Sequence, residues 1–221
     1  MNLFVTGTDT GCGKTFVTAA LLRHLARRGT RALGMKPIAS GAERTADGLV
    51  NEDVAALVAA ANVAAPPAIV NPYLFEPPAS PHIAAAASGA VVDLAVIAEA
   101  YAACRAAAEV VLVEGVGGWQ VPLAEDVDLA DLVRALGLPV LLVVGIRLGC
   151  INHALLSIAA IAEAGVVCHG WVANVLEPDL YAREAVVETL ARRIPAPLLA
   201  TIENGDTGSL DALAASLADT P

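Results

Sequence analysis

A short apolar run near the start of the chain enters a glycine-rich loop that ends in lysine and threonine. Residues 2–6 read Asn-Leu-Phe-Val-Thr, and residues 7–15 read Gly-Thr-Asp-Thr-Gly-Cys-Gly-Lys-Thr. A strand followed by such a loop and a helix is typical of a phosphate-binding site, because the glycines expose backbone N–H groups and the helix N-terminus is partially positive. This interpretation assigns Lys14 to the terminal phosphates of a nucleotide and Thr15 to a magnesium ion. The loop is one residue longer than the common pattern, so a tight turn without a ligand stays an alternative.

Short, continuously apolar runs alternate with helical patterns along the chain. The runs expected to form strands are residues 2–6, 31–35, 110–113, 139–145 and 166–173. The expected helices are residues 14–28, 51–62, 93–108, 126–136, 152–164 and 178–193, while the proline-rich residues 66–81 are expected to form a loop. Apolar strands between helices indicate a mostly parallel sheet with helices on both faces. With no internal repeat or linker-like segment, residues 1–221 are predicted to form a single doubly wound α/β domain.

Composition and charge exclude several classes of protein. The 221 residues are 57% hydrophobic and only 16% charged, a balance that argues against disorder. The net charge of −10 opposes binding to nucleic acid or to an anionic membrane. The apolar runs are too short or too often interrupted to cross a bilayer, and the N-terminus lacks the pattern of a secretion signal, so we expect a cytoplasmic protein. The four cysteines have no metal-binding spacing and are expected to be buried, reduced thiols.

Polar side chains also follow two of the other predicted strands. Lys36 and Ser40 come after the second strand, where Lys36 would stabilise a transferring phosphoryl group and Ser40 would bond a substrate, although a lysine in a loop is often a solvated surface charge. Asp53 lies in the first turn of a predicted helix, where it could simply balance the helix dipole. Glu114 ends a buried strand and precedes three glycines in four positions. Together with Thr15, these two carboxylates would form a magnesium site of hard oxygen ligands.

Two later segments are candidates for ligand contacts. Residues 148–152 follow a buried strand and open a helix, so their backbone N–H groups could hold an anion or a carboxylate. Asn174 follows the next predicted strand, and its amide could read the edge of a nucleobase. Asparagine at a strand end is also a common turn former, so both interpretations of Asn174 stay open.

Taken together, these motifs closely resemble the dethiobiotin synthetase family, whose fold is of the P-loop NTPase type. The matching segments are residues 6–10 with 13–15, 36–37 with 39–41, 71–72, 80–82, 113–115 with 117–119, 148–153 and 170–174. They occur in the family's order, and the longer phosphate-binding loop is the family's own form. The sequence departs from the family after residue 199, where residues 200–205 stand in place of a proline-containing loop that contacts the nucleotide.

The resemblance implies a homodimeric, cytoplasmic ligase of biotin biosynthesis. Such an enzyme converts 7,8-diaminononanoate, CO2 (or bicarbonate) and MgATP to dethiobiotin, ADP and phosphate, and it needs neither nucleic acid nor a membrane. One amine captures CO2 as a carbamate, ATP phosphorylates that carbamate, and the second amine closes the ureido ring. Lys14 and Lys36 would be the catalytic residues, because this chemistry depends on positioning and on charge stabilisation around the phosphoryl group.

The resemblance also assigns binding residues by motif. Those that would contact ATP or its magnesium ion are Thr10, Gly11, Cys12, Gly13, Lys14, Thr15, Phe16, Asp53, Glu114, Gly115, Val116, Gly117 and Asn174. Among these, the implied metal ligands are Thr15, Asp53 and Glu114, and the implied adenine contact is Asn174. Those that would bind the diamine are Ser40, Gly149, Cys150, Ile151 and Asn152, the last four through the substrate's carboxylate.

Two other classes of nucleotide-binding protein are alternatives. Related amidoligases that use glutamine need a glutaminase domain of about 150 residues, for which this sequence leaves no room. Dimerising ATPase switches that position septa or partition DNA usually carry a second lysine early in the phosphate-binding loop, where this chain has Thr8 and Asp9. A requirement for the diamine and bicarbonate in ATP turnover would separate the ligase from such a switch.

Overall fold

The centre of the fold is a six-stranded sheet in which every neighbouring pair of strands is parallel. The computed structural model describes residues 1–219. The order of strands across the sheet is β12 (Leu198–Ile202), β11 (Cys168–Val175), β10 (Val140–Ile146), β1 (Leu3–Gly7), β7 (Val110–Glu114) and β2 (Ala32–Met35). This sheet confirms the predicted doubly wound α/β architecture. Residues 220–221 of the predicted domain lie outside the described residues.

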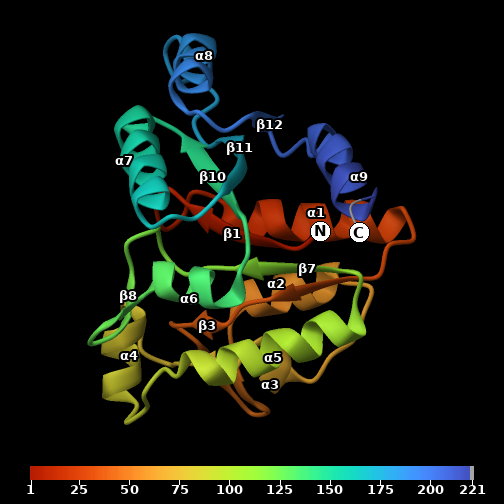
Figure 1. Ribbon diagram of the computed structural model, residues 1–221, viewed down its shortest axis with the longest axis vertical. Coiled ribbons are helices and arrows are strands. Elements are labelled where there is room, and N and C mark those ends of the chain that lie inside the picture. Colours follow the sequence, from red (N-terminus) through yellow and green to blue (C-terminus); the bar gives the residue numbers. More distant parts are fainter. Residues whose placement is uncertain (220–221) are drawn as a thin grey trace.

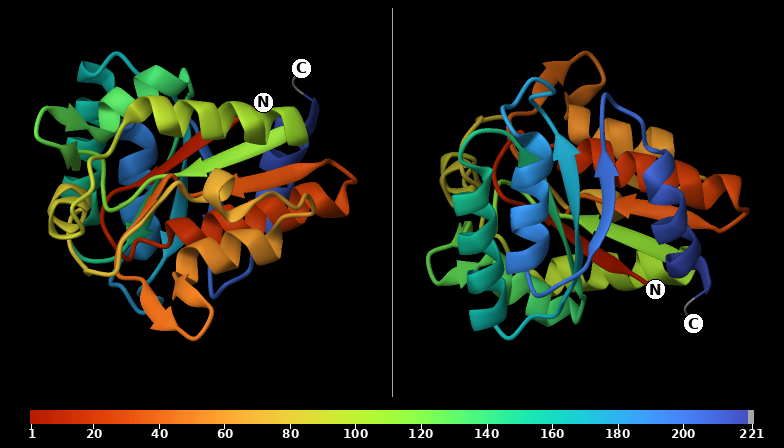
Figure 2. Two further views of the ribbon diagram at one scale, coloured as in Figure 1. Left: turned by 90° about the horizontal axis from the view of Figure 1, so that it is seen from below. Right: turned by 90° about the horizontal axis from the view of Figure 1, so that it is seen from above.

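Helices cover both faces of the sheet (Figures 1 and 2). One face packs against α1 (Lys14–Arg27), α2 (Glu52–Ala60) and α9 (Asp211–Asp219). The other face packs against α5 (Leu94–Ala107), α6 (Leu129–Leu136), α7 (Cys150–Glu163) and α8 (Arg183–Arg193). Successive side chains of a strand point to opposite faces, so Leu3 and Val5 join the core under α1 while Phe4 joins the other core. The left view of Figure 2 shows α5 on one side of the strands and α1 and α2 on the other.

Short elements complete the fold. They are the helices α3 (Pro67–Val70) and α4 (Pro81–Ala87), the parallel pair β3 (Ile38–Ala39) and β6 (Tyr73–Leu74), the hairpins β4 (Glu43–Thr45) with β5 (Gly48–Val50) and β8 (Pro122–Ala124) with β9 (Val127–Asp128), and a 3-10 turn (Gly208–Leu210). The expectation of a long, structured loop over residues 66–81 is therefore incomplete, because this segment contains α3, β6 and the start of α4. Pro67 and Pro81 open helices, because a proline at the first helical position loses no hydrogen bond there.

Several predicted boundaries also shift. The helix expected from residue 152 begins at Cys150, directly after Gly149, whose φ of 90° is left-handed. The helix expected from residue 178 begins only at Arg183, because Ala182 has a left-handed φ of 52° that a helix cannot contain. The strand expected over residues 166–173 runs from Cys168 to Val175, so Asn174 lies within it. β12 and α9 have no counterpart among the elements expected from the sequence.

The sheet topology marks one edge as the place for a ligand. From β1 the chain first adds β2 and β7 on one side and later adds β10, β11 and β12 on the other. A ligand in such a sheet binds beyond the carboxyl ends of the strands, where the order reverses. The loops after β1, β2 and β7 all leave this edge. Among the described residues, no helix combines the length and apolar character needed to span a membrane.

Candidate functional site

The loop between β1 and α1 is held open by glycine. Gly11 and Gly13 have left-handed φ values of 75° and 94°, which other residues rarely adopt. A Cβ on Gly7 would lie 2.2 Å from the Cys12 sulfur, and one on Gly13 would lie 2.1 Å from Nδ2 of Asn174. No side chain caps the N-terminus of α1 and no acidic residue occupies its first turn. The backbone N–H groups of this turn are therefore available to an anion such as a phosphate.

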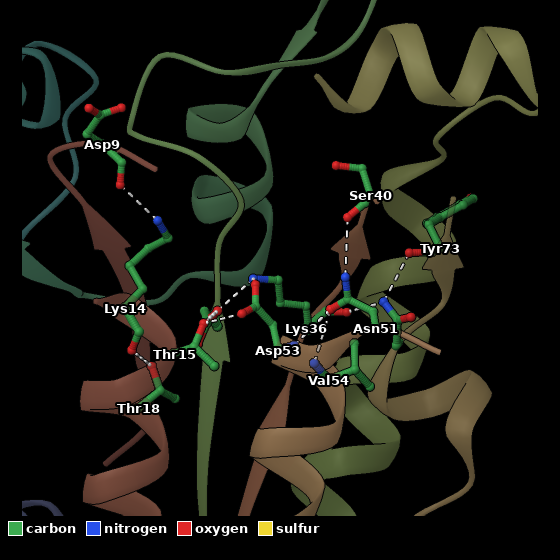
Figure 3. Close-up of polar contacts among 12 residues, drawn as sticks. Asp9, Lys14, Thr15, Thr18, Lys36, Ser40, Asn51, Asp53, Val54 and Tyr73 are labelled. Atoms are coloured by element: carbon green, nitrogen blue, oxygen red, sulfur yellow. Dashed lines mark hydrogen bonds and ion pairs between the residues drawn. The ribbon is translucent and has the colours of Figure 1, made fainter. Parts of the chain in front are cut away.

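Asp9 ties this loop to two cationic side chains. Its backbone carbonyl accepts a hydrogen bond from Lys14 Nζ at 3.1 Å, and its carboxylate accepts one from the Thr10 backbone N–H at 2.7 Å. The second carboxylate oxygen pairs with Arg147 at 2.8 Å, at the end of β10. Lys14 is buried, and burial lowers the pKa of its ammonium group. Figure 3 shows the Lys14 side chain directed at the Asp9 carbonyl.

A lysine, a threonine and two carboxylates meet where three strands end. The Thr15 hydroxyl lies 2.8 Å from Asp53 Oδ1 and 2.8 Å from Glu114 Oε1. Lys36 Nζ lies 2.7 Å from Asp53 Oδ2 and 2.6 Å from Glu114 Oε1. Figure 3 shows the Thr15 and Lys36 side chains converging on Asp53. Thr15, Asp53 and Glu114 thus lie together, and Lys36 joins them. The alternative of Lys36 as a solvated surface charge is wrong, because its side chain is only 3% exposed.

The local fold explains how Asp53 reaches this cluster. Asn51 caps α2, with its side-chain oxygen accepting from the backbone N–H groups of Asp53 and Val54. The Asn51 amide in turn donates to the Ser40 carbonyl at 3.2 Å, which joins the α2 cap to the loop after β3 (Figure 3). Asp53 thus lies both in the first turn of α2 and in the cluster. It can therefore balance the helix dipole and also serve as a metal ligand, the two roles expected from the sequence.

Neighbouring charges set the protonation states of Lys36 and Asp53. Burial alone would lower the pKa of Lys36, but the carboxylates of Glu114 and Asp53 outweigh it and raise that pKa. Partial burial would raise the pKa of Asp53, but Lys36 and the Thr15 hydroxyl lower it overall. Lys36 is therefore a cation and Asp53 an anion at neutral pH. The cluster therefore contains both a positive and a negative side chain, and a bound ligand would compete for their contacts.

The donor set fits a magnesium ion that also has phosphate and water ligands. Glu114 is fully buried, and its Oε2 has no hydrogen-bond partner among the described residues. An unpartnered buried carboxylate oxygen is costly unless a ligand or a water satisfies it. Magnesium is usually held by one or two carboxylates plus substrate phosphates, so Thr15, Asp53 and Glu114 suffice in number. Within residues 1–219 there is no cluster of three or more His, Cys, Asp or Glu side chains that could hold a metal on its own.

A cavity of about 760 Å³ opens beside this cluster. Its wall contains ten of the predicted site residues, namely Thr10, Gly11, Gly13, Lys14, Thr15, Lys36, Ser40, Asp53, Val116 and Gly117. Residues 78–81 also line the cavity, although they were not among the site residues expected from the sequence. The matched motif at residues 80–82 was the available signal, and its proximity to the site depends on the packing of α4.

The remaining predicted residues lie outside the cavity wall. Residues 149–152 do not line it, and Cys150 is buried in the core. Asn174 is buried and donates its amide to the Cys12 carbonyl at 3.0 Å, so it supports the phosphate-binding loop directly. Cys12 is also buried, whereas the Phe16 side chain is 41% exposed. The expectation of buried thiols is confirmed for three of the four free cysteines, while Cys168 is only partly buried.

Comparison with known proteins identifies close relatives. A family model described as an AAA domain matches residues 1–208. The chain is 54% identical over 194 residues to the ATP-dependent dethiobiotin synthetase BioD of Xanthomonas oryzae pv. oryzae, which covers 88% of this chain and 87% of that protein. It is 50% identical over 214 residues to the ATP-dependent dethiobiotin synthetase BioD of Aromatoleum aromaticum, and this match covers 97% of this chain and 95% of that protein.

Solved structures that are distant in sequence share the fold. The cell division protein MinD of Aquifex aeolicus superposes with a TM-score of 0.57 at 15% identity and covers 96% of this chain and 85% of that one. The cell division protein FtsY of Thermotoga maritima superposes with a TM-score of 0.58 at 17% identity, and the match covers 100% of this chain and 69% of that one. These likenesses confirm the P-loop fold and carry no statement about activity.

Proposed function

Since this chain belongs to the family of ATP-dependent dethiobiotin synthetases and is an ATP-dependent ligase that forms dethiobiotin, we propose that it does so from 7,8-diaminononanoate, CO2 and MgATP through a carbamate. The observation that carries this proposal is the cluster of Lys36, Thr15 and two carboxylates beside the open N-terminus of α1. A phosphoryl group transferred there would meet fixed positive charge and backbone donors together. Positioned charge of this kind is what phosphoryl transfer requires.

The phosphate-binding loop would orient ATP. Its backbone N–H groups would bind the β- and γ-phosphates, and Lys14 would leave the Asp9 carbonyl to contact them. Thr15, Asp53 and Glu114 would hold a magnesium ion, which when bound supplies positive charge at the phosphates. Other ATP contacts are proposed for Thr10, Gly11, Cys12, Gly13, Phe16, Gly115, Val116 and Gly117, and an adenine contact for Asn174.

Lys36 would act on the transferred group. An ammonium group has three donors, and Lys36 uses two of them on Asp53 and Glu114, which leaves one for an oxygen of the carbamate or of the phosphoryl group. The carbamate forms when one amine adds to CO2 and loses a proton to solvent. A carbamate oxygen then attacks the γ-phosphorus and ADP leaves. The second amine attacks the carbonyl carbon, loses a proton, and expels phosphate as the ring closes.

The diamine would extend from this cavity toward the start of α7. Ser40 lines the cavity, whereas residues 149–152 do not line the cavity of their own chain. This separation supports a homodimer in which each diamine is bound by two chains. Its amines would lie in the cavity of one chain, and its carboxylate would be bound by Gly149, Cys150, Ile151 and Asn152 of the other. We further propose that the enzyme is cytoplasmic and works as one domain.

The test is ADP release measured with each substrate omitted in turn. We expect turnover to require 7,8-diaminononanoate and bicarbonate together, with one dethiobiotin formed per ADP. Removal of magnesium by EDTA should abolish turnover, and excess MgCl2 should restore it. Equal ATP hydrolysis with and without the diamine would instead indicate an ATPase switch and would overturn the proposal.

A further inference from the structure

We propose that Asn71 is a positioning residue of this enzyme, which holds the backbone of Lys36 so that its ammonium group stays at the carboxylate pair. The inference rests on the function proposed above, in which Lys36 acts on the transferred phosphoryl group. Asn71 is buried and does not line the cavity, so it acts through Lys36 and not on a ligand.

The backbone of Lys36 lacks the support that a strand would give. β2 is an edge strand that ends at Met35, so Lys36 lies one residue beyond the last strand pairing. Its N–H donates to the Val70 carbonyl at 2.8 Å. In a regular parallel pair, its carbonyl would then accept from the N–H of the residue two positions after Val70. That residue is Pro72, which has no N–H to donate.

The side chain of Asn71 replaces this missing donor. Its Nδ2 donates to the Lys36 carbonyl at 2.6 Å and to the Tyr73 carbonyl at 3.0 Å. The pairing then resumes beyond the proline, where the Tyr73 N–H donates to the Pro37 carbonyl at 3.1 Å. The amide of Asn71 therefore supplies the donor that Pro72 lacks, between the Lys36–Val70 bond and the Tyr73–Pro37 bond.

The hydrogen bond from Asn71 matters because the position of the Lys36 ammonium group depends on the position of the Lys36 backbone. Lys36 Nζ lies 2.6 Å and 2.7 Å from two carboxylates, at the end of a long side chain that has no rigid segment of its own. The backbone anchor thus determines which positions the ammonium group can reach. A displacement of about 1 Å in such a group can cost on the order of 100-fold in rate.

The chain offers a matched control at the other end of the same strand. Asn62 also makes two side-chain bonds to the backbone near β2, because its Oδ1 accepts from the Ala32 N–H at 2.8 Å and its Nδ2 donates to the Thr30 carbonyl at 2.9 Å. Asn62→Ala and Asn71→Ala therefore remove the same number of backbone contacts. They differ in two respects: Asn62 is exposed whereas Asn71 is buried, and only Asn71 contacts the backbone of Lys36.

The first experiment is a double-mutant cycle in the diamine-dependent reaction. Asn71→Ala should lower kcat by roughly 10- to 100-fold with little change in the KM for ATP, while Asn62→Ala should lower the melting temperature and leave kcat within about 2-fold. In a Lys36→Ala background, Asn71→Ala should cause almost no further loss. An equal loss in both backgrounds, or an unchanged kcat in folded Asn71→Ala, would overturn the inference. If Asn71→Ala does not fold, Asn71→Ser keeps one donor and should give an intermediate kcat.

The second experiment observes Lys36 without turnover. Lys14 and Lys36 are the only lysines of the chain, so selective lysine labelling with 15N gives two side-chain ammonium signals. Asn71→Ala should shift or broaden the Lys36 signal and leave that of Lys14 in place, and Asn62→Ala should alter neither. An unshifted Lys36 signal would overturn the inference even if activity fell. Failure of the proposed function would be recognised separately, as ATP turnover by the parent enzyme that does not depend on the diamine.

Discussion

At the scale of single residues, the scarcity of lysine relative to arginine points to the cavity. The chain contains only two lysines, and both line the cavity, whereas the other strongly basic side chains are arginines. This distribution is visible in the sequence and would have favoured a functional Lys36 over a surface one. An ammonium group is a compact charge that can move between partners, whereas the planar guanidinium of arginine suits fixed, paired contacts.

Removal of either lysine should therefore damage catalysis far more than folding. We expect Lys14→Ala and Lys36→Ala each to lower kcat about 10²- to 10³-fold, or roughly 2.7–4 kcal/mol of transition-state stabilisation. Steady-state kinetics with diamine and bicarbonate measure the loss, and thermal unfolding checks the fold. Arg23→Ala, an exposed cation on the same helix as Lys14, is the control and should stay within about 2-fold of the parent enzyme. Normal turnover in either lysine variant would contradict the assigned roles.

Cysteine reactivity should depend on pH as burial dictates. Burial raises the pKa of the partly exposed Cys168 thiol to about 11, and the same effect raises the pKa of the buried Cys104 thiol to about 11. The thiolate is the reactive form, and below the pKa its fraction grows tenfold per pH unit. We expect Cys168 to be labelled slowly by iodoacetamide at pH 7 and about 100-fold faster at pH 9, as followed by peptide mass spectrometry. Fast labelling at pH 7 would show that the thiol is not shielded.

At the scale of elements, the sequence predicted five of the six strands of the central sheet and missed β12 and the short strand pairs outside it. β1, β7 and β10 are continuous apolar runs that are buried throughout, so hydrophobicity alone finds them. The β4–β5 hairpin is short and mostly exposed, so it has no hydrophobic signal of its own. β12 is an apolar run that starts directly after Pro197, and it was not expected from the sequence. The sequence also predicted that Thr15, Asp53 and Glu114 form one magnesium site, but not that Lys36 contacts both carboxylates. Their contacts depend on where three strand ends meet in space, which no local pattern encodes.

The first turn of α7 provides a test of the proposed carboxylate site. Ile151 is the second residue of this helix, so Ile151→Pro removes one backbone donor at a position where proline is tolerated. We expect the KM for the diamine to rise several-fold with the KM for ATP unchanged. Glu184→Pro makes the same change at the second position of α8 and should alter neither constant. A methyl ester of the substrate that binds as tightly as the free acid would contradict this placement.

At the scale of the whole molecule, the topology brings distant segments to one edge. The phosphate-binding loop, Lys36, Asp53 and Glu114 come from the first 114 residues, and all lie beyond the carboxyl ends of β1, β2 and β7. α7 begins across the switch point, after β10. The Arg147–Asp9 ion pair joins the two regions at 2.8 Å. The single chain thus gathers around one cavity the lysines and the loop proposed to bind the phosphates, while residues 149–152, the proposed carboxylate site, do not line that cavity.

The exposed face of α7 is where a second copy would complete the site. Leu148 and Leu156 are 87% and 63% exposed, and Leu156 lies one turn after the exposed Asn152 on the same face. A charge placed there would have to be desolvated at a dimer interface, so Leu156→Asp should weaken self-association and raise the KM for the diamine together. Sedimentation equilibrium over a range of concentrations measures the first effect, and kinetics at the same concentrations measure the second.

The control is Val167→Asp, which alters another exposed apolar side chain. Val167 is 69% exposed and lies next to the start of β11, so this change should leave self-association and the KM for the diamine unchanged. If Leu156→Asp became monomeric but kept the parent's diamine KM, each chain would bind its substrate alone, and the shared site would be wrong.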